Sequence, residues 1–187
     1  MKRFITALLA LAASILGTGC AMVAPHYTAS LDNVQALKDS GSYAAKVGEF
    51  QAGKDKAYAS PISIRGSSLA SPYNDSYASY LAAAIKQELS LANKLSPDAN
   101  AEISGTVLKN DIDITGSSTG WAEVDARFIV KRSGQLRYDQ IKSVKHEFPS
   151  SFAGNIAIPK AVQEYPVAVQ KLLNLLYADK AFIEALK

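Results

Sequence analysis

The stretch WAEVDARFIVKR, residues 121–132, alternates apolar with polar side chains along most of its length. The apolar residues take every second position: Ala122, Val124, Ala126, Phe128 and Val130. A period of two places such residues on one face of a β-strand. Ile129 is the apolar exception on the opposite face. The stretch therefore predicts a sheet strand with one buried face and one face toward water.

Neighbouring segments extend this strand into a sheet. Residues 101–116 (AEISGTVLKNDIDITG) and 135–148 (QLRYDQIKSVKHEF) both favour β-structure. Ser133 and Gly134 suit a tight turn between residues 121–132 and the strand that follows, which predicts a hairpin. Residues 43–52 and 60–66 are two further β candidates. We expect a mostly antiparallel sheet of about four to five strands.

Two long segments show the period of an amphipathic helix, and two short helices flank them. Apolar residues recur at helical spacing within residues 77–92 and 162–177. A start at Ser71–Pro72, Asn74 or Asp75 is predicted for the first segment, and a helix from near Pro159 with a kink at Pro166 for the second. Ser30 and Asp179 are predicted to cap the short helices. The sequence indicates an α+β, two-layer sandwich with the two long helices packed on one face of the sheet.

The first residues have the layout of a secretory signal. Lys2 and Arg3 precede an apolar run, residues 4–16, that is shorter than the roughly 20 residues needed to cross a bilayer. We therefore expect residues 1–19 to be a signal peptide that is removed. Gly17 and Gly19 would also permit ordinary secretory cleavage without a lipid.

The junction residues 16–20, LGTGC, resemble the lipobox of bacterial lipoproteins, in which the cysteine is lipidated and becomes the new N-terminus. Gly17 stands where that pattern usually has an aliphatic residue, and Leu16 lies one place earlier. Cys20 is the sole cysteine, so no internal disulfide is expected. We predict that Cys20 carries the lipid, that residues 20–29 are the lipidated N-terminus and a tether, and that residues 30–187 form a single α/β domain.

Charge argues against a nucleic-acid partner. The chain has 20 Lys and Arg and 17 Asp and Glu, and two of the basic residues lie in the predicted signal peptide. The mature chain is thus close to neutral, and it contains no block of like charges to follow a phosphate backbone. Two histidines and one cysteine, far apart in sequence, predict no metal site. Glycine-rich phosphate-binding motifs are missing too, so we expect no cofactor.

A serine motif is the only hint of catalysis. Residues 116–120, GSSTG, fit the letters of a hydrolase nucleophile elbow, but that elbow precedes a helix and a strand is predicted here. A small serine hydrolase using Ser118 and His146 is therefore kept only as an alternative. We expect no catalytic residues and no enzymatic activity.

Two sets of apolar side chains are candidates for a binding surface. Residues 150–159, SSFAGNIAIP, read as a loop between a strand and a helix, in which Phe152, Ile156 and Ile158 either bind a partner or pin the loop to the core. If Ile112, Ile114 and Ile129 are exposed on the sheet, they form a docking surface for a protein or a lipid chain.

The order of elements, with the pieces LGTGC, SPYNDSYASYLAAAIKQEL, EISGTVLKNDIDI, FPSSFAGNIAIPKAVQEY and KLLNLLYADKAFIEAL, resembles small uncharacterised Gram-negative envelope lipoproteins. These are two-layer α/β lipoproteins of the kind represented by YajG and the N-terminal modules of curli-secretion lipoproteins. The resemblance implies several acyl chains, such as palmitate, on Cys20. It also implies sorting to the outer membrane, because Ala21 rather than Asp follows the cysteine.

These observations lead us to expect a non-enzymatic lipoprotein held by its lipid on the periplasmic face of the outer membrane. There it would bind a protein partner in envelope assembly or transport. An accessory lipoprotein of a lipid or lipopolysaccharide transport system is an alternative, which predicts an apolar groove between sheet and helices. The oligomeric state is left open by the sequence.

Overall fold

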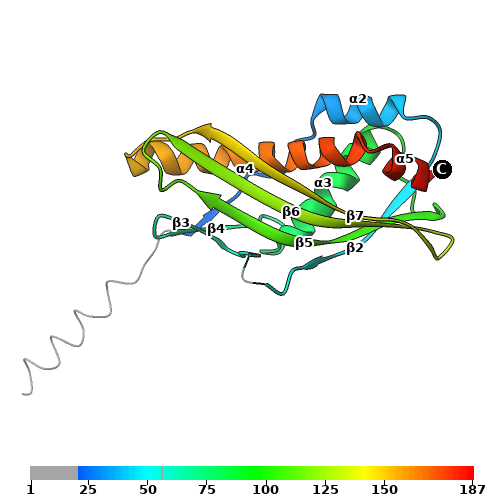
Figure 1. Ribbon diagram of the computed structural model, residues 1–187, viewed down its shortest axis with the longest axis horizontal. Coiled ribbons are helices and arrows are strands. Elements are labelled where there is room, and N and C mark those ends of the chain that lie inside the picture. The colour runs from blue at the N-terminus through cyan, green and yellow to red at the C-terminus, as the bar shows by residue number, and fades with distance from the viewer. Residues whose placement is uncertain (1–20, 56) are drawn as a thin grey trace, which may run out of the picture.

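The computed structural model describes residues 21–55 and 57–187, so the predicted signal peptide and Cys20 lie outside the described residues. Four strands build the main sheet in the order β2-β5-β6-β7 (Figure 1). They are β2 (Ala45–Ala52), β5 (Ala101–Asp113), β6 (Thr119–Arg132) and β7 (Gln135–Pro149). β5, β6 and β7 pair antiparallel, and β2 pairs parallel with β5 at one edge.

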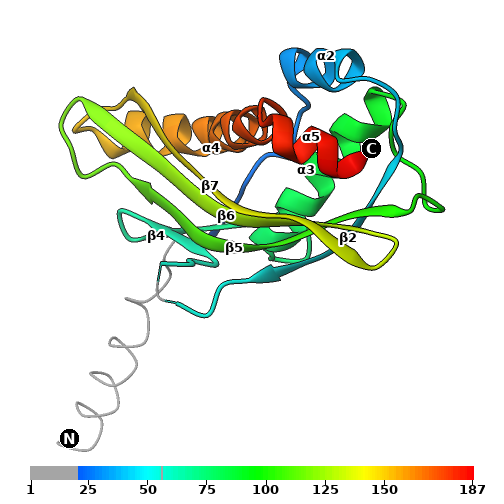
Figure 2. The same ribbon diagram turned by 45° about the vertical axis from the view of Figure 1, so that its right-hand side comes forward.

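Helices cover one face of this sheet. α3 (Tyr77–Leu91) packs on β2 and β5, and α4 (Gly154–Tyr177) packs on β6 and β7. Figure 2 shows both helices on the same side, with α2 (Leu31–Asp39) and α5 (Lys180–Leu186) beside them. The predicted α+β class and two-layer packing are confirmed.

A smaller sheet adds to the predicted architecture. β1 (Ala21–Val23), β3 (Ile62–Ile64) and β4 (Ser67–Ala70) pair in the order β1-β4-β3. The segment predicted at residues 60–66 is thus a strand of this second sheet rather than of the main one. Its turn at Arg65 and Gly66 has positive φ at both residues, 45° and 80°.

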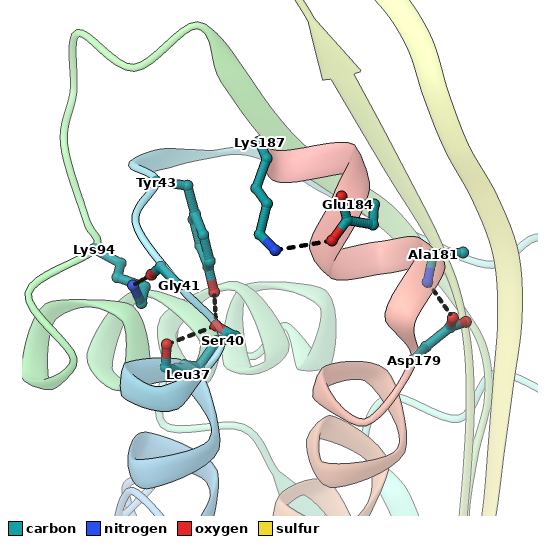
Figure 3. A network of polar contacts seen from close by, with 9 residues as sticks. All are labelled: Leu37, Ser40, Gly41, Tyr43, Lys94, Asp179, Ala181, Glu184 and Lys187. Atoms are coloured by element: carbon teal, nitrogen blue, oxygen red, sulfur yellow. Dashed lines mark hydrogen bonds and ion pairs between the residues drawn. The ribbon is translucent and has the colours of Figure 1, made fainter.

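Side-chain caps define the starts of α2, α3 and α5. Ser30 accepts a hydrogen bond from the backbone N–H of Asn33, and Asp179 accepts one from the backbone N–H of Ala181 at 2.9 Å (Figure 3). Both predicted caps are confirmed. α3 instead begins after Ser76, whose hydroxyl accepts from the N–H of Ser79, so the predicted earlier start is wrong.

α4 begins at Gly154, upstream of the predicted start near Pro159. Pro159 and Pro166 both lie inside the helix. Proline removes an N–H donor without ending the helix here, and packing of the apolar stripe against the sheet maintains the helix past both prolines. Most of the stretch predicted as a loop, residues 150–159, is therefore helical.

Ile112 and Ile114 are buried in the core, so they are no part of an exposed docking surface. The cause is a β-bulge in β5, where the register against β6 shifts between Val107 and Lys109. One extra residue reverses which side chains face the helices. Ile112 and Ile114 consequently join Ile103 on the buried face.

The predicted tether is also wrong, because residues 21–29 belong to the folded domain. Ala21–Val23 is strand β1, Ala24 and Tyr27 are buried, and the N–H of Ala24 donates to the carbonyl oxygen of Ala70 at 2.9 Å. The hydroxyl of Tyr80 donates to the carbonyl oxygen of Pro25 at 3.0 Å. The described structure therefore begins without a spacer.

Candidate binding surfaces

Two of the predicted binding residues are strongly exposed. Phe152, just before α4, is 85% exposed, and Ile156, in the first turn of α4, is 59% exposed. Ile158 is half-buried and packs against the core, as the pinning interpretation expects. The structure therefore keeps Phe152 and Ile156 together at one end of α4 and separates Ile158 from them.

Arg65 connects this end of α4 to the small sheet. Its guanidinium donates to the carbonyl oxygen of Phe152 at 2.8 Å and to that of Gly116 at 3.3 Å, and it also contacts the carbonyl oxygen of Ile114. One cation thus joins the β3–β4 turn, the β5–β6 loop and the start of α4 through three carbonyl groups. We call Phe152, Ile156 and the Arg65–Gly66 turn the apolar end.

The outer face of the main sheet is largely ionic. Lys109 and Lys145 both pair with Glu123, and their hydrogen bonds hold the pKa of Glu123 below its usual range. Ile129 lies half-buried on this face, close in register to the ion pair of Arg127 with Asp139 on β7. Ile141 of β7, which pairs with Arg127 and is 56% exposed, lies on the same face, so this face offers a small aliphatic contact beside an ion pair rather than a broad apolar docking surface.

A groove of about 520 Å³ runs between α2 and α4 and reaches β7. Its lining mixes polar and apolar side chains: Asp32 and Asn33 from α2, Val144 from β7, and Gln170, Lys171 and Leu175 from α4. Leu175 is 45% exposed there. The groove offers an aliphatic contact flanked by an anion and a cation, which suits a protein segment better than an acyl chain.

Beneath this groove lies a buried carboxylate, Glu88 of α3. The hydroxyl of Tyr27 donates to it at 2.6 Å, the backbone N–H of Ser30 at 3.0 Å, and the side-chain amide of Asn33 at 3.2 Å. Burial raises the pKa of Glu88, and these hydrogen bonds oppose the rise only in part. Glu88 thus joins the N-terminal segment and α2 to α3.

The sequence reasoning missed Glu88. The available signal was its place in the helix, because Glu88 lies four residues after Ala84 on the apolar stripe. A charged residue on a buried helix face requires a polar partner from another element. Asn33 supplies it and extends the network to α4, where its amide also donates to the carbonyl oxygen of Gln170 at 2.9 Å.

His146 of β7 is buried in a chain of charged groups. Lys171 donates to its Nδ1 at 2.8 Å, so Nε2 carries the hydrogen and donates to Glu164 at 2.7 Å. Burial acts to raise the pKa of Glu164, but hydrogen bonds from Lys160 and His146 outweigh burial and lower it. Both ring nitrogens are therefore engaged in contacts between β7 and α4.

Ser118 does not reach this histidine. It lies in the exposed loop before β6, and its carbonyl oxygen accepts from the N–H of Ser150 at 2.8 Å. In the β6–β7 register, Ala122 pairs with His146 and Thr119 with Pro149, which places Ser118 beyond the end of the paired strands. The structure therefore does not bring Ser118 and His146 together.

Within residues 21–55 and 57–187, no cluster of three or more His, Cys, Asp and Glu side chains is arranged to hold a metal ion. The same part of the chain contains no helix with the length and apolar character required to span a membrane.

No protein-family model and no curated protein matches this sequence. Solved structures do match the fold. Protein XCC0632 from Xanthomonas campestris, a DUF330 protein, aligns over 89% of this chain and 97% of its own, with a TM-score of 0.62 and 12% identity. At that identity the likeness shows a shared fold.

Two further structures align with lower scores. A candidate lipoprotein from Caulobacter crescentus covers 81% of this chain and 93% of its own, with a TM-score of 0.44 and 12% identity. The hypothetical protein CT253 from Chlamydia trachomatis covers 71% of this chain and 98% of its own, with a TM-score of 0.40 and 10% identity.

Proposed function

We propose that this protein is a non-enzymatic lipoprotein, anchored through a lipid on Cys20 to the periplasmic face of the outer membrane, that binds a protein partner in envelope assembly or transport. The observation that carries the binding role is the groove between α2 and α4, whose lining combines exposed Leu175 with Asp32 and Lys171. The LGTGC junction and the resemblance to YajG-like envelope lipoproteins support the anchor. Lys171 and Glu164 occupy both ring nitrogens of His146, which argues against a hydrolase in which this histidine would act as the base for Ser118.

The groove also distinguishes this proposal from lipid transport. A transport accessory would need an apolar space between sheet and helices, whereas Phe128, Val130, Leu172 and other buried side chains fill the interface there. The observed groove lies between two helices and is lined partly by Asp32, Asn33, Gln170 and Lys171. A protein segment with both apolar and polar side chains fits such a lining.

The anchor is tested by changing its cysteine. Cys20→Ala is expected to move the protein from the detergent-soluble membrane fraction to the soluble periplasmic fraction, because the acyl chains supply the membrane affinity. Blocking lipoprotein signal peptidase is expected to leave the wild-type precursor uncut. Fractionation and immunoblotting measure both, and a wild-type protein that is soluble without detergent would contradict the anchor.

The partner is tested by photo-crosslinking in intact cells. A photoreactive amino acid at Leu175 is expected to yield an adduct with an envelope protein, whereas the same probe at exposed Leu136, on β7 away from the groove, yields none. Mass spectrometry of the adduct names the partner. Equal adducts from both positions, or adducts with lipid alone, would count against a protein partner in the groove.

A further inference from the structure

We propose that the apolar end rests on the membrane, with Phe152 and Ile156 inserted into the lipid surface. This inference rests on the proposed lipid anchor at Cys20 and specifies which face of the domain that anchor holds against the bilayer. Three features carry it: strand β1 begins at Ala21, the residue that directly follows Cys20 in the sequence; β1 lies beside β4; and the exposed residues have the chemistry of a lipid contact.

No spacer residues separate the proposed lipid site from strand β1. Ala21 directly follows Cys20 and is already the first residue of strand β1, where it pairs with Ser68 of β4. Neighbouring Cα atoms lie about 3.8 Å apart, so a lipid on Cys20 holds Ala21 within a few ångströms of the headgroups. A long flexible stalk would allow any face to meet the membrane. Here the surface around the start of β1 must lie close to it.

The apolar end lies on that side of the domain. β1 runs parallel to β4, and Ala21 pairs near the beginning of β4, directly after the Arg65–Gly66 turn. The guanidinium of Arg65 reaches from this turn to the carbonyl oxygen of Phe152 at 2.8 Å. Figures 1 and 2 agree, since the orange start of α4 lies at the same end of the molecule as β4.

The exposed side chains suit a lipid surface. Phe152 lies just before α4 and Ile156 lies in its first turn, so both exposed side chains belong to the same end of that helix. With 85% and 59% of their surface exposed, both would gain free energy on leaving water for a lipid interface. Arg65 places a cation beside them, where lipid phosphates would lie. Two small apolar contacts are too weak to bind a membrane alone, but a lipid anchor on the same side of the domain raises their effective concentration at the membrane and makes them sufficient to orient the domain.

Tryptophan fluorescence of the mature lipoprotein in phosphatidylcholine vesicles tests this orientation. Trp121 is the only tryptophan, so Trp121→Phe gives a silent background for single probes. Phe152→Trp is expected to shift its emission to the blue and to lose most of its intensity when the acyl chains carry bromine. Leu136→Trp, at a position that is 59% exposed beside the β6–β7 turn, is the control and is expected to keep its intensity.

Each outcome decides the question. A lipid on Cys20, found by mass spectrometry, together with quenching at position 152 alone supports the inference. A lipidated, vesicle-bound protein with neither probe quenched, or with both quenched alike, overturns the orientation and leaves the anchor standing. A blue shift at position 152 without bromine quenching assigns the apolar end to a protein contact and also overturns it. A protein without lipid on Cys20 overturns the anchor, and this inference with it.

Discussion

Replacing Glu88 by alanine is expected to lower the free energy of unfolding by about 3 to 5 kcal/mol. The substitution removes the acceptor of three buried or half-buried donors, the hydroxyl of Tyr27, the N–H of Ser30 and the amide of Asn33. Each donor left without a partner retains its desolvation cost. Because these donors belong to the N-terminal segment and α2, both should detach from α3 before the sheet unfolds.

Urea unfolding followed by circular dichroism measures this loss. Glu184→Ala on α5 is the matched control, because 69% of that side chain is exposed and its removal should change stability by no more than about 0.5 kcal/mol. Glu88→Gln, which keeps the volume and one acceptor oxygen, is expected to fall between the two. Equal losses for Glu88→Ala and Glu184→Ala would refute a stabilising role for the buried network.

The effect of Glu88 also has a definite pH dependence. Burial raises the pKa of Glu88 in the folded protein above the unfolded value of about 4.5. A group with a raised folded pKa contributes fully below its unfolded pKa, and part of that contribution is lost as pH rises through the folded pKa. The stability difference between the wild type and Glu88→Ala should therefore be larger near pH 4 than near pH 8.

The regular parts of the fold were predictable because each carries a period. Residues 121–132 alternate with period two and form β6, and residues 162–177 follow the helical period within α4. The bulge near Leu108 has no such signal. One inserted residue reverses the faces of Ile112 and Ile114, so the strand could be predicted while the face that these two side chains take could not.

The N-terminal segment was not predictable for a different reason, because its order comes from distant contacts. Tyr27 bonds to Glu88, and Pro25 to Tyr80, across more than fifty residues of sequence. A strand of three residues such as β1 is too short to show a period. Phe152 and Ile156 were singled out because apolar residues and a glycine lie between a predicted strand and a predicted helix, which gave no information on their exposure, whereas the groove arises only when α2 and α4 pack together.

Phe182→Ala in the C-terminal helix should cost about 3 to 5 kcal/mol of stability. Phe182 is fully buried, and its ring packs at 5.5 Å from that of Tyr138 on β7 and at 6.1 Å from that of Tyr177 at the end of α4. α5 has only seven residues, too few to be stable alone, so this ring provides much of what holds it on the sheet. Truncation should therefore release α5 as well as leave a cavity.

The control for this loss is the same substitution at an exposed ring. Phe152→Ala removes identical atoms from a side chain that is 85% exposed, so stability in solution should change by less than about 0.5 kcal/mol. On vesicles, where the orientation of the domain is measured instead of its stability, Phe152→Ala is expected to have the larger effect of the two substitutions. Phe152→Ala should weaken the orientation of the domain on the membrane, whereas Phe182→Ala should leave the apolar end at the far end of α4 intact. Denaturant unfolding measures the stability of both variants in solution. Bromine quenching of an Ile156→Trp probe, placed in the Trp121→Phe background, measures the orientation of the domain on vesicles. Loss of quenching in Phe152→Ala alone would show that Phe152, which has no role in folding, contacts the membrane.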